Sequence, residues 1–419
     1  MSASPGESAT SRRPEALHGT NSSRAELTRV DAGPYDLVVG GGLLIDPEKG
    51  TSVVGDIAVR DGRISAVLAP GTTGGVCAEY VDAHGLLVTP GLIDLHAHVY
   101  DGATGLGIAA DLAGIGSGVT TVVDAGSSGS DTFEDFDRTV VAPSVTRVLS
   151  WLNISRHGLT RGTTELAGRD DIRSADTVRT ILARRDVIRG IKIRMSRSVV
   201  GQNGLEPLRA AKRVTAQIAA ETGEPFPVMV HVGNAPPAFG DVLDLLGPGD
   251  VVTHAFHGKA GGLFPEADSG PLRQARDAVQ RGVRLDVGHG SASFAFDTME
   301  RALEHGIRPH TVSTDIHGRS LVGPVHDLTT TMTKLLAAGL TLDETVRAAT
   351  SAAAESIGLA GEIGSFAAGC VADITLLDRV EDATPLVDAE GRTRTAGHRL
   401  TAVAAVRAGV THRIRKADA

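Results

Sequence analysis

The sequence predicts an α/β fold, namely a (β/α)8 TIM barrel with a small accessory β-sandwich domain built from both chain ends. Between residues 89 and 355, eight short apolar runs alternate with stretches whose apolar residues recur at helical spacing. On either side, residues 35–88 and 356–415 are instead typical of short strands separated by Gly and Asp-Gly turns. The alternation implies a parallel sheet, and eight strands close a barrel.

The stretches between the predicted barrel strands are expected to be helices, and several end at Gly, as is usual after a helix C-cap. Thr341 and Glu344 match a capping box that opens a helix predicted over residues 341–358. An open doubly wound sheet is the alternative, but no Gly-x-Gly-x-x-Gly turn follows the first strand. The eight predicted strands are residues 91–99, 118–126, 145–155, 188–196, 227–234, 250–258, 283–290 and 310–318.

Composition and charge exclude several classes of function. The chain has 419 residues, a net charge of −9 and no basic run of the kind that binds nucleic acid. It has no apolar run long enough to span a membrane. Its two cysteines argue against a disulfide framework and favour a reducing, cytoplasmic location. Residues 1–34 are polar and are predicted to be a disordered N-terminal extension.

Polar residues occur near the ends of the predicted barrel strands, where barrel enzymes carry their catalytic groups. His96 and His98 are two residues apart on the first strand, so both imidazoles can point to the same face and reach one ion. His231 and His254 each follow a run of apolar residues, and Asp315 ends the eighth strand. Neutral imidazole is the commonest metal ligand, so this pattern favours a metal site.

Lys192, on the fourth predicted strand, does not fit a simple cation site. An ammonium group beside a divalent cation would be repelled and poorly solvated. Lys192 either faces outward, with its stem packed between helices, or its neutral amine adds carbon dioxide to become an anionic carbamate. The four histidines and Asp315 favour the carbamate, which can bridge two cations.

These motifs closely resemble the amidohydrolase superfamily over roughly residues 35–415. The likeness is carried by VTPGLIDLHAHVYDG, GVTTVVDAG, IKI, MVHVGN, VVTHAFHG and STDIHG. The phrases LNISRHGL and LDVGHGSASF are similar to its deacetylase-type binuclear branch, which is related to dihydroorotases and hydantoinases.

The resemblance implies a binuclear metal-dependent hydrolase with two divalent metal ions, of which zinc is expected. His96, His98 and Asp315 would hold one ion and His231 with His254 the other. A carboxylated Lys192, formed with carbon dioxide, and a hydroxide would bridge them. Asp315 would also be catalytic, taking the proton of the attacking water and passing it to the leaving group.

The expected reaction is hydrolysis of an acyl amide or ester, such as an N-acetyl or O-acetyl group, of a small carboxylate-bearing compound. Arg156 and His289 are predicted to bind the substrate carboxylate, and Asn153 is a further substrate-binding candidate. Tyr100, Arg194, Lys259 and Arg319 are loop candidates of the same kind.

Two alternatives stay open, and a third is disfavoured. A cyclic amidase, which opens a ring as dihydroorotases or hydantoinases do, would use the same six ligands. A non-catalytic scaffold is the alternative of another class, although such relatives tend to lose metal ligands. Nucleobase deamination is disfavoured, because no Glu follows His231 closely and Lys192 is present. The sequence does not set the oligomeric state, and a homo-oligomer is common for this type of barrel.

Overall fold

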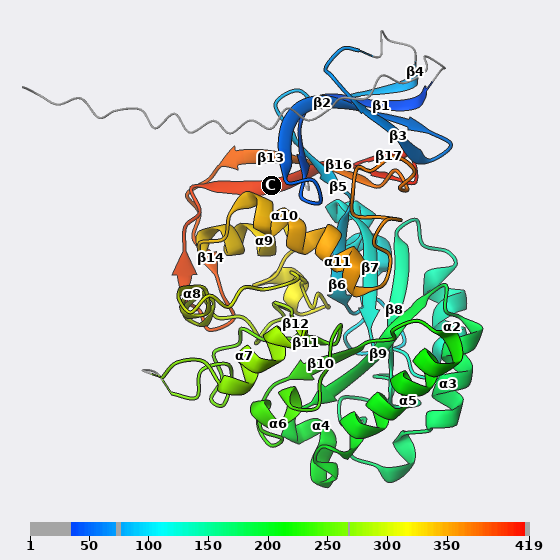
Figure 1. The fold of residues 1–419 in the computed structure, drawn as a ribbon, viewed down its shortest axis with the longest axis vertical. Coiled ribbons are helices and arrows are strands. Elements are labelled where there is room, and N and C mark those ends of the chain that lie inside the picture. Colours follow the sequence, from blue (N-terminus) through cyan, green and yellow to red (C-terminus); the bar gives the residue numbers. More distant parts are fainter. Residues whose placement is uncertain (1–34, 73–76, 267–268, 415–419) are drawn as a thin grey trace, which may run out of the picture.

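The computed structural model describes residues 35–72, 77–266 and 269–414. The predicted disordered extension lies outside the described residues. Figure 1 shows strands from the two ends of the chain side by side at one end of the molecule, next to the barrel.

Seven parallel strands form the barrel wall, and each pairs with its neighbour in chain order. Parallel strands joined by crossovers all place their carboxyl ends at the same mouth of a barrel. Polar residues at those ends are therefore brought together. The strands are β6 (Leu92–Ala97), β7 (Val119–Ala125), β8 (Arg147–Asn153), β9 (Ile188–Met195), β10 (Val228–Val232), β11 (Val251–Thr253) and β12 (Arg284–Leu285).

The eighth predicted strand is not a regular strand, which corrects the sequence prediction. Residues 311–316 instead form isolated parallel bridges, one to Asp286 just beyond β12 and one to Ala97 at the end of β6. They therefore join the two edges of the seven-stranded sheet. The interruption has a local cause, because Asp315 has a φ of 50°, in the left-handed region that an extended strand cannot contain.

The helices lie on the outside of the barrel, where Figure 1 shows them around the sheet. The predicted capping box is confirmed, since the Thr341 side chain accepts from the Glu344 N–H and the Glu344 side chain accepts from the Thr341 N–H. The helix predicted over residues 341–358 is wrong as a single element. Thr350 leaves the helical region, with φ −132° and ψ −93°, and divides it into α10 and α11. The helices are α1 (Ala110–Ala113), α2 (Phe133–Phe136), α3 (Ser174–Ala183), α4 (Arg197–Val200), α5 (Glu206–Thr222), α6 (Phe239–Leu243), α7 (Arg273–Gln280), α8 (Phe296–Glu304), α9 (Leu328–Ala337), α10 (Leu342–Ala349) and α11 (Ser351–Ser356).

A second, eight-stranded sheet combines strands from both ends of the chain. Its order is β17-β16-β13-β5-β1-β2-β3, with β4 paired to β1, and the antiparallel pairing of β5 with β13 joins the two chain ends. The description of this region as a sandwich domain stays a prediction. Its strands are β1 (Tyr35–Asp46), β2 (Thr51–Arg60), β3 (Arg63–Leu68), β4 (Cys77–Asp82), β5 (Leu87–Pro90), β13 (Ile374–Glu381), β16 (His398–Arg407) and β17 (Val410–Arg413), while β14 (Leu386–Val387) and β15 (Thr393–Arg394) form a separate pair.

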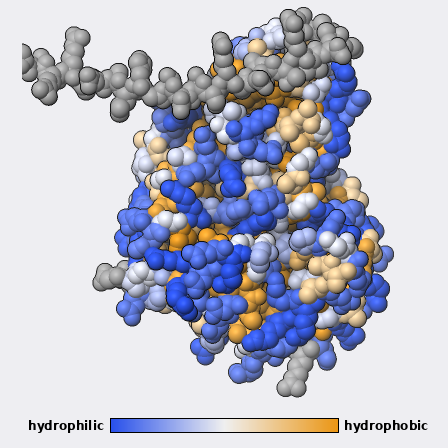
Figure 2. Space-filling model, in the orientation of Figure 1, coloured by the Kyte–Doolittle hydropathy of each residue, from blue (hydrophilic) through white to orange (hydrophobic). Residues whose placement is uncertain are grey.

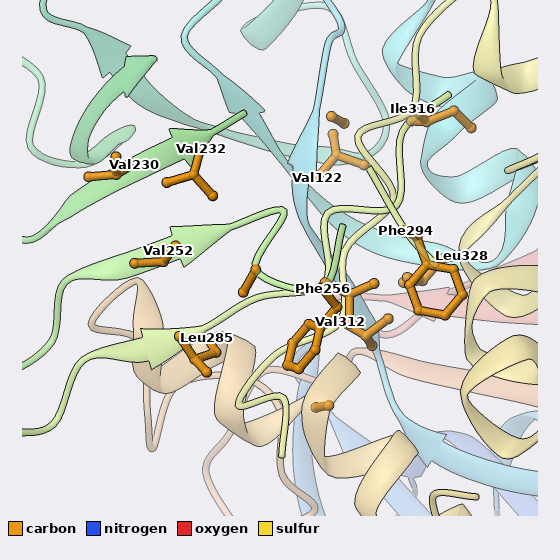
Figure 3. Packing of buried hydrophobic residues seen from close by; sticks show 14 of the residues in the cluster. Val122, Val230, Val232, Val252, Phe256, Leu285, Phe294, Val312, Ile316 and Leu328 are labelled. Atoms are coloured by element: carbon orange, nitrogen blue, oxygen red, sulfur yellow. The ribbon is translucent and has the colours of Figure 1, made fainter. Parts of the chain in front are cut away.

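Alternate residues of the barrel strands enter two different apolar clusters. Val122 and Val230 belong to the large cluster that also includes helix residues, part of which Figure 3 shows from close by. Their neighbours Val123 and Met229 belong to a separate cluster with Trp151. This is the period of two expected of strands that are covered on both faces. Figure 2 shows mostly hydrophilic residues on the visible face. Among the described residues, none of the helices has the length and apolarity needed to cross a bilayer.

Close packing inside the barrel gives a first prediction. A Cβ atom added at Gly190 would lie 2.3 Å from the ring of buried Trp151 and 2.7 Å from the Pro227 carbonyl oxygen. We expect Gly190→Ala to lower the free energy of unfolding by about 1–3 kcal/mol, because overpacking forces neighbours to move. Gly247→Ala is the matched control, since nothing lies within 4 Å of its Cβ position. Equal urea midpoints for the two variants would contradict this account of the packing.

Candidate metal centre

Six polar side chains converge at the mouth of the barrel. His96 lies near the end of β6 with His98 just beyond it, Lys192 lies on β9 and His231 lies on β10. His254 directly follows β11, and Asp315 lies in the segment that joins the sheet edges. The parallel sheet therefore brings these six residues together, although more than two hundred positions separate the first from the last.

The tightest group is formed by His96, His98 and Asp315. The Nε2 atoms of the two imidazoles each lie 3.1 Å from Oδ1 of Asp315. Their candidate ligand atoms all lie within 4.8 Å of one another. Two imidazoles and a carboxylate at this separation are a suitable donor set for a divalent transition metal.

His231 and His254 complete a second group beside the first. Their ring centroids are 4.4 Å apart, and the His254 ring lies 5.1 Å from that of His96. The His254 Nε2 atom is 3.8 Å from Oδ2 of Asp315. This Nε2 is buried and has no hydrogen-bond partner among the described residues. A buried polar atom without a partner is unfavourable, so its position fits a metal ligand.

The Lys192 side chain is fully buried within the same group. Its Nζ lies 3.0 Å from Nε2 of His96 and 3.4 Å from the sulfur of Met229. Burial lowers the pKa of Lys192 to about 7, so its neutral amine is readily available near neutral pH. The outward-facing alternative is therefore wrong.

Burial holds three histidines of the site in the neutral form, in which imidazole binds metals. Burial, together with the positive charge of a protonated Lys192, lowers the pKa of His96 well below its usual value. Burial likewise lowers the pKa of His231 well below normal and that of His254 to about 3. Burial alone would raise the pKa of Asp315, but the adjacent imidazoles lower it well below its ordinary value.

Hydroxyl groups contact Nδ1 of His96 and of His98, and a buried aspartate lies close to each hydroxyl-bearing residue. The Nδ1 of His96 lies 2.9 Å from the Thr253 hydroxyl. Burial raises the pKa of nearby Asp286, and the Thr253 side chain counteracts this rise. The Nδ1 of His98 lies 3.0 Å from the Ser127 hydroxyl, and the Ser127 backbone N–H donates to buried Asp124 at 2.8 Å. Such outer partners fix which ring nitrogen faces a metal.

Sequence reasoning missed these supporting residues. Asp124 and Asp286 are completely buried, as is Asp94, which accepts from the backbone N–H of Thr314. The signal was present, because each aspartate lies between two apolar residues of a predicted strand. A charged residue in a barrel strand needs partners, and here those partners lead to the site.

Two of the six residues have unfavourable backbone conformations. His254 has a φ of 65° and Asp315 a φ of 50°, both in the left-handed region. Non-glycine residues rarely adopt this conformation, and such strain concentrates at functional sites.

Comparisons with known proteins agree with this geometry. Residues 278–406 match the model of the amidohydrolase family. A curated relative from Brucella anthropi, named as a deacetylase, is 38% identical over 339 residues, covering 80% of this chain and 82% of that one. The chain belongs to the amidohydrolase family.

Solved structures of similar proteins support the same assignment. A structure titled as an adenine deaminase has a TM-score of 0.84 and 34% identity, covering 90% of this chain and 100% of its own. One titled as a dihydroorotase has a TM-score of 0.80 and 32% identity, covering 90% and 97%. The resemblance inferred from sequence motifs is confirmed, and the chain is a hydrolase of this family.

The three predicted substrate-binding residues of this amidohydrolase all have partners within the protein. The Asn153 amide donates to the Gly126 carbonyl, and its oxygen accepts from the Ser155 N–H. The Arg156 guanidinium is paired with Asp131 at 2.5 Å. His289 is completely buried, and both of its ring nitrogens have partners. A substrate would have to displace these contacts, so the three roles stay predictions.

The other loop candidates differ in whether a partner already neutralises them. Arg194 is bonded to Glu165 through two nitrogens, at 2.7 and 2.8 Å, and the Tyr100 hydroxyl donates to Asp135. Lys259 is half-buried in the loop after β11, and within the described part of the chain it forms no ion pair.

The hydroxyl link to His96 gives a prediction for metal affinity. We expect Thr253→Val to weaken zinc binding at least ~10-fold, because it removes the bond that orients the imidazole. Thr311→Val is the matched control, since the Thr311 hydroxyl donates to the same Asp286 at 2.7 Å without touching an imidazole. Competition with a chelator measures both dissociation constants. Equal weakening by the two variants would assign the effect to Asp286 alone.

Proposed function

We propose that this amidohydrolase is a binuclear metal-dependent deacetylase. Its substrate would be an acyl amide or ester of a small carboxylate-bearing compound, such as an N-acetyl amino acid or an O-acetyl hydroxy acid. The observation that carries the proposal is the convergence of four imidazoles, Lys192 and Asp315 at one mouth of the barrel. A relative named as a deacetylase, 82% of whose length is covered by the match, supports the reaction class.

The same six residues would hold the metals. His96, His98 and Asp315 would bind one ion, and His231 with His254 the other. Carbon dioxide would convert the neutral Lys192 amine into a carbamate that bridges them. Zinc suits nitrogen and oxygen ligands and a reaction without redox chemistry. Bound zinc would polarise the scissile carbonyl and lower the pKa of the attacking water.

Asp315 is the residue proposed to move protons. Its Oδ1 contacts the imidazoles of His96 and His98, while Oδ2 lies 3.8 Å from Nε2 of His254, beyond hydrogen-bonding distance. Oδ2 would therefore accept the proton of the attacking water and transfer it to the leaving nitrogen or oxygen.

Lys259 is proposed to bind the substrate carboxylate. Its ammonium is close enough to the site to lower the pKa of His254, and Asp315 in turn acts on the pKa of Lys259. Burial lowers the pKa of Lys259, because its ammonium is partly removed from water. A substrate carboxylate would supply the negative partner that such a cation needs.

Ring opening of a cyclic amide is the second candidate, favoured by the likeness to a solved dihydroorotase. The two reactions would share metals and proton transfer, so the loops would decide between them. The scaffold alternative has less support, because all six candidate ligands are present and converge.

Three broader assignments also remain proposals. These are the division into residues 35–88 with 356–415 and 89–355, the sandwich form of the first unit, and a cytoplasmic location. A homo-oligomer is proposed only from what is common for this type of barrel.

A substrate screen tests the function. We expect zinc- and bicarbonate-supplemented protein to hydrolyse acetylated amino or hydroxy acids faster than it opens dihydroorotate or hydantoins, or deaminates adenine. Asp315→Asn should lower kcat at least ~100-fold because proton transfer is lost. Zinc content measured on the same samples separates this effect from metal loss. Preferential ring opening would replace the deacetylase assignment, and a protein without stoichiometric metal would favour the scaffold.

The proposed carboxylate contact predicts a change in KM. We expect Lys259→Met to raise KM about 10-fold or more for an acetylated acid, since a hydrogen bond to a charged group contributes ~1.5–3 kcal/mol. The carboxamide analogue of the same substrate should show little change. Arg156→Met is the matched control, because Asp131 already neutralises Arg156. If KM rises only in the Arg156 variant, Arg156 and not Lys259 binds the substrate carboxylate.

A further inference from the structure

A second buried lysine lies behind the metal centre and has no role in the function proposed above. Lys334, on α9, has a relative exposure of 1%. Its Nζ lies 2.8 Å from Nε2 of His289 and donates to the Pro324 carbonyl oxygen at 2.6 Å. It forms no ion pair with a carboxylate in the part of the chain that the structure describes.

The backbone beside His289 contacts two of the candidate metal ligands. The Gly288 carbonyl oxygen lies 2.5 Å from Nδ1 of His254. A Cβ atom at Gly290 would lie 2.5 Å from Oδ2 of Asp315, so this residue packs directly against the carboxylate. His289 lies between these two contacts, and its side chain turns away from them toward Lys334.

The backbone carbonyl oxygens of this segment determine which imidazole nitrogen of His254 and of His289 carries the proton. A carbonyl oxygen can only accept, so Nδ1 of His254 carries a proton and its Nε2 lone pair is left for an ion. The Nδ1 of His289 likewise donates to the Gly290 carbonyl, at 2.8 Å. The Nε2 of His289 must then accept, and Lys334 is its donor.

The segment needs an external anchor because its backbone is unusual. Gly288 and Gly290 have φ values of 49° and 51°, a conformation that glycine reaches at no steric cost but does not prefer. His289 is the only side chain between them. Its ring stacks near Phe294, with centroids 4.9 Å apart, and its polar contacts lead to Lys334.

We propose that Lys334 is a positioning residue for the metal centre. Through its hydrogen bond to His289 it fixes residues 288–290, and these orient His254 and hold Asp315 in place. This inference rests on the proposed metal-dependent function. Stability alone does not explain the lysine, because burying an amine without a carboxylate partner is less favourable than burying an apolar side chain of similar shape.

The test compares metal affinity with thermal stability. We expect Lys334→Met to weaken zinc binding at least ~10-fold, the size typical of lost outer-shell contacts, while the melting temperature of the metal-free protein stays equal or rises. His289→Phe removes the same bond from the other side and should match it. The double variant should be no weaker than either single one, because both act through one interaction.

A lysine from elsewhere in the barrel provides the control. Lys212 is ion-paired with Asp250 at the opposite end of the strands, so Lys212→Met should leave zinc affinity unchanged even where it lowers stability. Unchanged zinc affinity in Lys334→Met and His289→Phe overturns the inference and leaves the deacetylase proposal standing. A lower melting temperature with unchanged affinity also overturns it, since the pair is then purely structural. A wild-type protein that takes up no zinc and hydrolyses no acylated acid overturns both.

Discussion

Removal of water from the barrel mouth is the constraint on which the rest of the site depends. The positive forms of three imidazoles and one amine cannot be buried together at little cost, so burial and mutual repulsion favour the neutral forms of these groups. Neutral nitrogen atoms with free lone pairs are ligands, and one carboxylate among them attracts cations. The same desolvation that makes the cluster costly in an apolar core makes it effective as a metal site.

The remaining buried polar groups follow from this constraint. Three of the four imidazoles have a hydrogen-bond partner at Nδ1, and the partner differs each time. The Thr253 hydroxyl serves His96, the Ser127 hydroxyl serves His98 and a backbone carbonyl serves His254. Buried aspartates lie next to Thr253 and Ser127, so polar groups continue from the site into the strands.

Sequence patterns predicted the parts of this structure that depend on short-range periodicity. Apolar runs located the seven regular strands, and the positions of polar residues near their ends located all six converging side chains. The irregular segment at 311–316 and the break at Thr350 could not be predicted in this way, because both depend on backbone conformations set by distant contacts. The partners of Arg156 and His289 were also out of reach, since Asp131 and Lys334 are identified only by folding.

Substrate choice must then come from the loops. The barrel and the metal ligands cannot distinguish a deacetylase from a dihydroorotase, and this chain is similar to proteins of both names.

The positively charged loop residues differ in whether a carboxylate of the protein already neutralises them. Arg156 and Arg194 are paired with carboxylates of the protein, so a substrate carboxylate would gain little by approaching them. Lys259 is partly desolvated and has no such partner among the residues that the structure describes, so an anionic group there would compensate its charge. This charge beside the candidate metal centre is the basis of our proposal that the substrate carries a carboxylate.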